Sequence, residues 1–137
     1  MRVAAMLVGS AGSLFGSFLA ARNVSTDAML VLFTEGGSVG FLLLEAVLSL
    51  LYLAALAASI TVLLRLGVGV ILLLVCTIGV ITFGGLELYL YLSILGYPRE
   101  VSLFASPFLY PVIAAPFLLA ASVLAFLAAR VSQRSVA

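Results

Sequence analysis

The sequence contains no histidine, no tryptophan and no lysine, and it has a single cysteine, Cys76. Without histidine, a histidine-ligated haem and histidine-based acid or base catalysis are excluded. One cysteine also excludes an intrachain disulfide and a CxxC redox or metal motif. Charged residues are scarce as well, at 8% of the chain, whereas they make up about a quarter of a soluble domain. These absences exclude several enzyme classes and argue against a soluble fold.

Long apolar runs take the place of the missing charge. Hydrophobic residues make up 66% of the 137 residues, and the mean hydropathy is +1.42. A helix that crosses roughly 30 Å of hydrocarbon needs about 20 apolar residues, and the sequence has four segments of about that length. They are residues 3–21, 40–64, 66–97 and 107–129. We therefore predict an all-α fold, in which residues 1–137 form a single transmembrane domain built as a four-transmembrane-helix bundle.

Two local signals refine this outline. Ser106 is a good N-cap and Pro107 suits a first helical turn, so the last helix is expected to begin at Pro107. In the loop after the first span, Ala28 to Phe33 form a short apolar stretch that is followed by the breakers Gly36 and Gly37. This stretch is too short to cross a bilayer, so we predict a short interfacial helix in the first outer loop.

The arginines set the predicted orientation, because cytoplasmic flanks carry an excess of basic residues. With both termini inside, the cytoplasmic side would hold Arg2, Arg65, Arg130 and Arg134. The outer side would hold Arg22 and Arg99. We therefore predict a multi-pass protein of the cell membrane, oriented N-in and C-in.

Two glutamates lie inside the predicted spans and are the best candidates for a chemical site. Glu45 is 20 residues before Arg65 and Glu87 is 22 residues after it, which places both about 30 Å from that turn in helices that rise about 1.5 Å per residue. Tyr52 shares a helix face with Glu45, and Tyr91 shares one with Glu87. Two adjacent carboxylates in a low dielectric can share a proton or hold a cation. The sequence therefore predicts an ion- or proton-binding site of these four residues; alternatively, the glutamates snorkel to water or pair with arginines.

Small residues recur along the first span. Gly9, Ser13 and Ser17 are four residues apart, and so are Gly12 and Gly16. Such ridges allow another helix backbone to approach closely. We predict that these residues form a helix-packing face, either within the bundle or against another copy of the chain or a partner subunit.

The leading hypothesis for function is a small non-enzymatic subunit of a membrane assembly, either a homo-oligomer or an accessory subunit of a larger complex. The sequence shows no paired nucleophile and base and no ligand set for a metal or cofactor. The expected partners are the lipid bilayer and copies of the chain or other membrane subunits, because the small-residue face offers a docking surface. A formal charge of +1 and the lack of a basic patch beyond Arg130 and Arg134 give no support for nucleic-acid binding, so no nucleic acid is expected as a partner. The alternative is a small channel or transporter that uses Glu45 and Glu87.

The predicted layout also resembles that of a known group of proteins. Four helices, an outer loop with a short interfacial helix and a tight inner hairpin are similar to the topology of the DsbB and vitamin K epoxide reductase group. The resemblance implies redox cysteines in the outer loop and at the outer start of the last helix. The matching places read NVSTDAMLVLFTEGG and VSLFASPFLYP, without cysteine. The resemblance therefore concerns topology and carries no site residue.

Overall fold

The structure, a computed structural model, describes residues 1–33, 39–95 and 110–136. In these residues the chain forms four helices. They are α1 (Arg2–Phe33), α2 (Val39–Leu64), α3 (Leu66–Leu95) and α4 (Tyr110–Val136). The stretches long and apolar enough to cross a membrane are Arg2–Ser25, Leu42–Leu64, Leu66–Leu90 and Ile113–Ser135. The prediction of an all-helical fold with four apolar spans is confirmed for this part of the chain.

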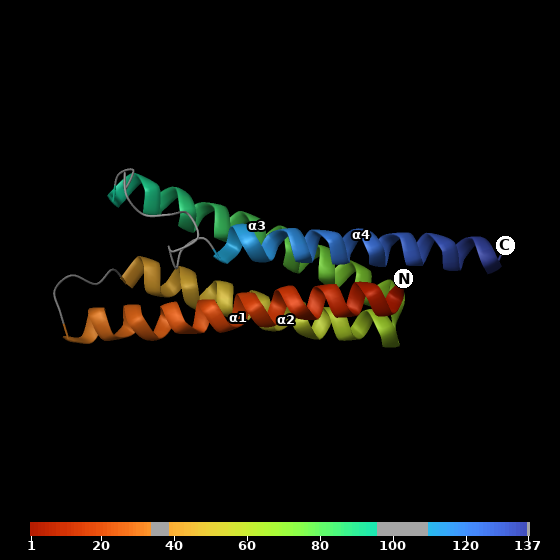
Figure 1. Cartoon of the computed structure of the whole chain (residues 1–137), viewed down its shortest axis with the longest axis horizontal. Coiled ribbons are helices and arrows are strands. Elements are labelled where there is room, and N and C mark those ends of the chain that lie inside the picture. The colour runs from red at the N-terminus through yellow and green to blue at the C-terminus, as the bar shows by residue number, and fades with distance from the viewer. Residues whose placement is uncertain (34–38, 96–109, 137) are drawn as a thin grey trace.

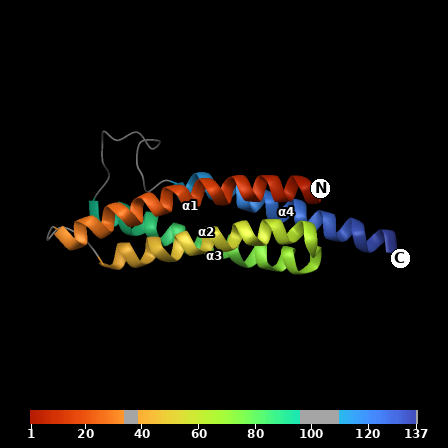
Figure 2. The same cartoon turned by 90° about the horizontal axis from the view of Figure 1, so that it is seen from below.

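The helices run antiparallel to their neighbours in sequence (Figure 1). Both α1 and α3 pack against α2 and α4, whereas α2 and α4 lie diagonally across the bundle and touch each other little. We call the end where α1 begins, α2 meets α3 and α4 finishes the arginine end. Arginines 2, 65, 130 and 134 lie there. We call the opposite end, nearer to Glu45 and Glu87, the glutamate end. At the arginine end, α4 continues past the other helices (Figure 2).

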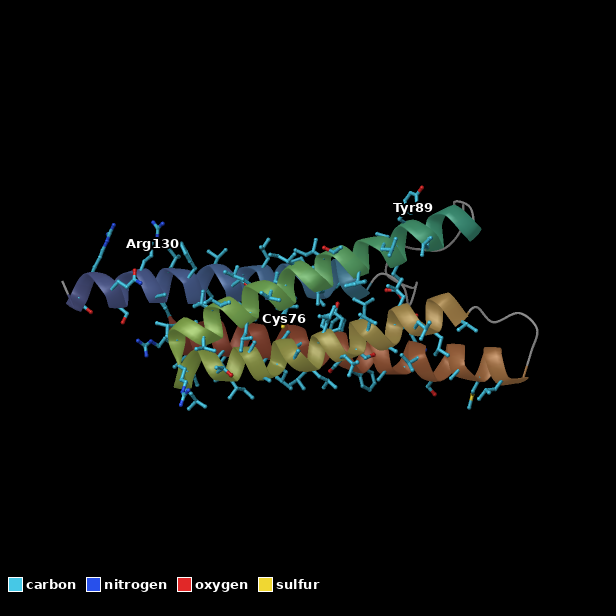
Figure 3. The ribbon with its side chains drawn as sticks, turned by 180° about the vertical axis from the view of Figure 1, so that it is seen from behind. Cys76, Tyr89 and Arg130 are labelled. Atoms are coloured by element: carbon cyan, nitrogen blue, oxygen red, sulfur yellow. The ribbon has the colours of Figure 1, made fainter. Side chains whose placement is uncertain are left out.

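Small side chains let these helices approach one another closely. The buried alanines are Ala5, Ala20, Ala55, Ala58, Ala114, Ala121, Ala125 and Ala128. Larger aliphatic side chains, Leu48, Leu73 and Leu118, fill the space between them and are fully buried. The outward faces are just as apolar, because lipid tails are no more polar than the interior. Tyr89, 68% exposed, points away from the bundle near the glutamate end of α3 (Figure 3).

The structure corrects the prediction of a separate interfacial helix at residues 28–33. These residues continue α1, which runs unbroken from Arg2 to Phe33. The physical reason is that residues 17–35 contain neither glycine nor proline. The polar residues 25–27 could cap a new helix, but no residue near them interrupts the preceding one. The predicted first outer loop is correspondingly shorter than expected, and the topological resemblance to the DsbB group loses one of its elements.

The last helix differs from its predicted range at its C-terminal end, and its predicted start is not tested. The described helix begins at Tyr110, and the predicted start at Pro107 with its cap lies outside the described residues. At the other end α4 runs to Val136 rather than stopping at residue 129. No glycine or proline follows Pro116, so the helix continues through polar sequence after the apolar run has ended.

Candidate functional site

Glu45 and Glu87 both lie in the bundle interior, and the exposed fraction of each is 0%. Glu45 is three residues inside the α2 span, which starts at Leu42, and Glu87 is three residues before the α3 span ends at Leu90. Both glutamates therefore lie near the glutamate end at similar depth, as expected from their distances in sequence from Arg65. The side chains nevertheless face the neighbouring helices rather than lipid or water, so the alternative of glutamates that snorkel to the surface does not describe this structure.

The α2–α3 packing brings the two glutamates to the same level. Gly79 on α3 lies against Leu51 on α2, where an added Cβ would be 3.1 Å from Leu51 Cδ2. Glu87 is eight residues after Gly79 on α3. Because the helices are antiparallel, the residue opposite Glu87 is eight residues before Leu51 on α2, which is Leu43, two residues from Glu45. Two buried carboxylates on adjacent helices therefore occupy one layer of the bundle.

Tyr52 belongs to the same site. Its side chain is fully buried, and its hydroxyl lies within electrostatic range of the Glu87 carboxyl. Side chains in a helix lean toward the N-terminus of that helix. Because α2 and α3 run in opposite directions, Tyr52 leans toward the glutamate end and Glu87 leans toward the arginine end. The two groups approach each other even though their backbones are at different levels.

Helix α1 makes room for these polar side chains. Gly16 lies against the Tyr52 ring, where an added Cβ would be 2.6 Å from Tyr52 Cζ. Gly9 lies in the same way against Ser59. Gly9 and Gly16 are seven residues apart on α1, and so are their partners Ser59 and Tyr52 on α2. One further step of seven residues places Asn23, which is 6% exposed, opposite Glu45. We call Glu45, Tyr52 and Ser59, which recur every seven residues along the buried face of α2, the polar column.

A second interior polar contact joins α3 to α4. Thr77 Oγ1 and Ser122 Oγ are 2.9 Å apart, and each also lies within hydrogen-bond distance of a carbonyl of its own helix, Leu73 at 2.7 Å and Leu118 at 2.9 Å. These two hydroxyls are mutually satisfied. Ser13 on α1 differs: its Oγ is buried and makes no hydrogen bond with any described residue.

The small residues predicted to form a packing face on α1 lie mostly inside the bundle. Gly9 and Gly16 face α2, and Gly12 faces α4, where an added Cβ would be 2.6 Å from Phe117 Cβ. Ser17 is half-buried and its hydroxyl donates to the Leu14 carbonyl at 3.1 Å. The packing face therefore serves the fold of this chain, and it is not left open for another.

The predicted site gains one residue, Asn23, and the side chain of one of its predicted residues, Tyr91, is not described. Tyr91 lies in α3, but its side chain is outside the described part of the chain. Two buried polar residues were not among the predicted ones: Asn23, which lies opposite Glu45, and Ser122, which belongs to the separate contact with Thr77. For Asn23 the sequence did hold a signal, because it follows Gly9 and Gly16 at the seven-residue spacing of the polar column. For Ser122 we find no comparable signal.

The chemistry available here is that of two carboxylates with neutral oxygen ligands around them. In the described residues no group of three or more acidic, histidine or cysteine side chains could hold a metal ion. A proton or a monovalent cation needs fewer charged ligands than a divalent metal, and both fit two carboxylates with a tyrosine hydroxyl and an amide nearby. With its four candidate spans, the chain has the features of a multi-pass membrane protein. It matches no protein-family model, no curated protein and no solved structure.

Proposed function

We propose that this chain is a small non-enzymatic membrane protein, a channel or transporter that binds a proton or a monovalent cation between Glu45 and Glu87 and exchanges it at the glutamate end. The observation that carries the proposal is the complete burial of both carboxylates in one layer of the bundle. Two negative charges in an apolar interior repel each other and lose their hydration. A bound proton or cation removes part of that cost, so the folded bundle favours binding.

The position of the pair near the end of the spans supports exchange with water. Both glutamates are three residues from a span boundary, about 4.5 Å along a helix. A group at that depth can reach solvent through a small movement of a helix end. A charge at the bilayer centre would need a larger opening.

The polar column extends the site toward the arginine end. Its members are two helical turns apart, about 10.5 Å, which is too far for direct hydrogen bonds between them. A proton that travels along the column therefore needs water between the side chains. Ser13 lies on α1 between Gly9 and Gly16, and hence between the levels of Ser59 and Tyr52. Its buried Oγ, without a hydrogen bond among the described residues, is a ligand for such a water.

The hypothesis of an assembly subunit remains a prediction, but the small-residue face of α1 no longer supports it. The small-residue face of α1 packs against α2 and α4, so it no longer needs a partner to explain it. Native mass spectrometry of the protein extracted in mild detergent would test this hypothesis. Stoichiometric foreign subunits would support an accessory subunit of a larger complex, and a homo-oligomer free of other chains is compatible with the ion-binding proposal as well as with self-assembly. A monomer would contradict the assembly hypothesis.

Flux in reconstituted vesicles tests the proposal. Purified protein in liposomes receives a pH gradient in one experiment and a sodium or potassium gradient in another, with a fluorescent reporter of the ion inside. We expect flux above that of empty vesicles for one of these ions. Glu45→Gln and Glu87→Gln should each lower it to the level of empty vesicles, because one carboxylate alone no longer forms the paired site.

The matched control is Glu100→Gln, which removes an acid outside the apolar spans and should keep the flux. Every variant must show the same elution volume and melting temperature as the unmodified protein, so that loss of flux is not loss of fold. Wild-type protein without flux of any of these ions, or glutamine variants that retain it, would contradict the proposal.

A further inference from the structure

A pocket lies at the arginine end, between the start of α1 and the last turns of α4. Its volume is about 330 Å³, and it is lined by Met1, Arg2, Ala128, Val131, Ser132 and Ser135. The pocket opens to the surface of the bundle. It is far from the two glutamates, and the proposed ion exchange does not use it.

The residues that line this pocket are both polar and apolar. The polar ones are Arg2, Ser132 and Ser135. Arg2 Nη2 donates to Ser132 Oγ at 3.5 Å, which links α1 to α4, and the Ser135 hydroxyl donates to the Ser132 carbonyl of its own helix at 2.9 Å. The apolar ones are Met1, Ala128 and Val131. The pocket therefore fits a molecule with an anionic head and an apolar continuation.

The charged side chains near the pocket have one sign among the described residues. Four of the six arginines lie at this end, at positions 2, 65, 130 and 134, whereas the acids of the chain stand at positions 27, 35, 45, 87 and 100. No acid therefore lies near the arginine end in the described part of the chain to neutralise Arg2. Arginine binds phosphate oxygens through paired donors, and serine hydroxyls add further donors.

The pocket also lies at the depth of lipid headgroups. The candidate spans begin at Arg2 and end at Ser135 at this end of the bundle. Arg130, on the neighbouring turn of α4, holds its guanidinium carbon 4.8 Å from the centre of the Phe126 ring, an arrangement suited to an interface where a cation stacks on an apolar surface. Arg130 is near the free end of α4 in Figure 3.

From these observations we propose that the pocket binds the phosphate of an anionic phospholipid headgroup, with Arg2 and Ser132 on the phosphate oxygens and the apolar lining residues beside the glycerol and the first acyl carbons. The site would tie the beginning of α1 to the end of α4 through the lipid. It holds for either orientation of the protein in the membrane, and it is independent of what Glu45 and Glu87 do.

Native mass spectrometry in detergent tests the proposal directly. The protein is mixed with equal amounts of phosphatidylglycerol and phosphatidylcholine that carry the same acyl chains. We expect one phosphatidylglycerol to remain bound to the unmodified protein in clear preference to phosphatidylcholine. Arg2→Gln should abolish that preference, and Ser132→Ala should weaken it, because each removes a donor from the phosphate.

The matched control is Arg65→Gln, which removes the same charge at the same end but in the α2–α3 turn, outside the pocket. It should retain the preference for phosphatidylglycerol. Equal losses in Arg2→Gln and Arg65→Gln would show a diffuse charge effect and overturn the proposal. Equal retention of both lipids would also overturn it. Added inorganic phosphate should not displace the lipid; displacement would assign the pocket to a soluble anion instead.

Thermal unfolding provides a second readout that does not depend on survival of the complex in the gas phase. Phosphatidylglycerol should raise the melting temperature of the unmodified protein and of Arg65→Gln more than phosphatidylcholine does. The extra rise should be absent in Arg2→Gln. A variant that fails to fold would be recognised by its melting curve without lipid. If Arg2→Gln does not fold, Ser132→Ala is compared with the unmodified protein instead. An unchanged lipid preference in Ser132→Ala would contradict the proposal.

Discussion

At the scale of single residues, Tyr52 organises the interior. It is the largest fully buried side chain of the described residues, and it touches α1 through Gly16 while it lies within electrostatic range of Glu87 on α3. A tyrosine of this size fits between helices because α1 has no side chain at position 16. The packing of the site therefore depends on a glycine that has no chemistry of its own.

This dependence predicts the effect of Gly16→Ala. The new methyl group would overlap the Tyr52 ring, so the ring or α1 must move, and we expect a loss of about 1–3 kcal/mol of stability. The control is Gly85→Ala on α3, where an added Cβ meets nothing within 4 Å. It should match or slightly exceed the stability of the unmodified protein, because alanine favours helix by up to about 1 kcal/mol over glycine. Thermal unfolding in one detergent, followed by circular dichroism, measures both. Equal effects of the two substitutions would contradict this account of Tyr52.

Part of the candidate site could be identified without coordinates. Glu45 and Glu87 stand out because charges are rare in apolar runs, and Tyr52 follows Glu45 on one helix face. For Asn23 the seven-residue spacing after Gly9 and Gly16 was a signal, but residue type alone identifies neither Asn23 nor the separate Ser122, because serine and asparagine also occur on exposed faces of such helices. Their burial depends on which faces of α1 and α4 meet the rest of the bundle, and that is decided by packing.

At the scale of helices, the α2–α3 hairpin is the closest backbone approach among the described glycines. Gly69 lies against the backbone of Val62, and an added Cβ would be 2.5 Å from Val62 N and 2.6 Å from Val62 Cα. A flexible side chain could move away from a new methyl group, but a helix backbone cannot do so without shifting the whole hairpin. The tight turn at Arg65 therefore depends on glycine one turn into α3.

We expect Gly69→Ala to cost at least as much as Gly16→Ala, at the upper end of about 1–3 kcal/mol, because two helices must separate. Gly67→Ala is the control in the same turn, since nothing lies within 4 Å of its added Cβ. Its effect should stay within about 0.5 kcal/mol, or be slightly stabilising. Melting temperatures of the two variants in the same detergent give the comparison. A stable Gly69→Ala protein would mean that the hairpin is looser than described.

The ends of α1 and α4 show the limit of local signals for helices. A candidate cap at residues 25–27 and the glycines after residue 33 indicated a separate helix at residues 28–33, and the end of the apolar run indicated an end to the last helix at residue 129. Helix α1 continues through the candidate cap, because a cap favours a boundary by only about 1 kcal/mol and residues 17–35 contain no glycine or proline. Helix α4 continues past residue 129, because no glycine or proline follows Pro116. The apolar spans themselves agreed with the structure, since their length is set by the bilayer and not by a single residue.

At the scale of the whole molecule, the antiparallel arrangement places the start of α1, the α2–α3 turn and the end of α4 at one end. This predicts a definite pattern of accessibility for single cysteines in a Cys76→Ala protein. Met29→Cys, near the end of α1, should react with a membrane-impermeant maleimide in intact cells. Gly67→Cys and Ser135→Cys should react only after permeabilisation if the arginine excess sets the orientation.

The outcomes of this labelling experiment separate fold from orientation. Reaction of positions 67 and 135 in intact cells, with position 29 protected, would reverse the orientation and keep the fold. Different behaviour of positions 67 and 135 would contradict the fold itself. All three positions lie outside the polar column, and each is exposed, so labelling should not require unfolding.

The sequence by itself determined that this chain forms apolar helices of spanning length, that a tight turn joins two of them, and that two carboxylates lie at one depth. These properties depend on composition over stretches of about 20 residues, which the bilayer imposes on any helix that crosses it. Only the tertiary structure decided which faces meet. The helices are apolar on every side, because lipid and interior have similar polarity. Hydrophobic periodicity therefore does not indicate which face of a helix is buried in the bundle. Tyr52 fits against Gly16 and Ser59 fits against Gly9, and these contacts turn the face of α2 that carries Glu45 toward the interior. The packing of α3 against α2 and α4 places Glu87 inside.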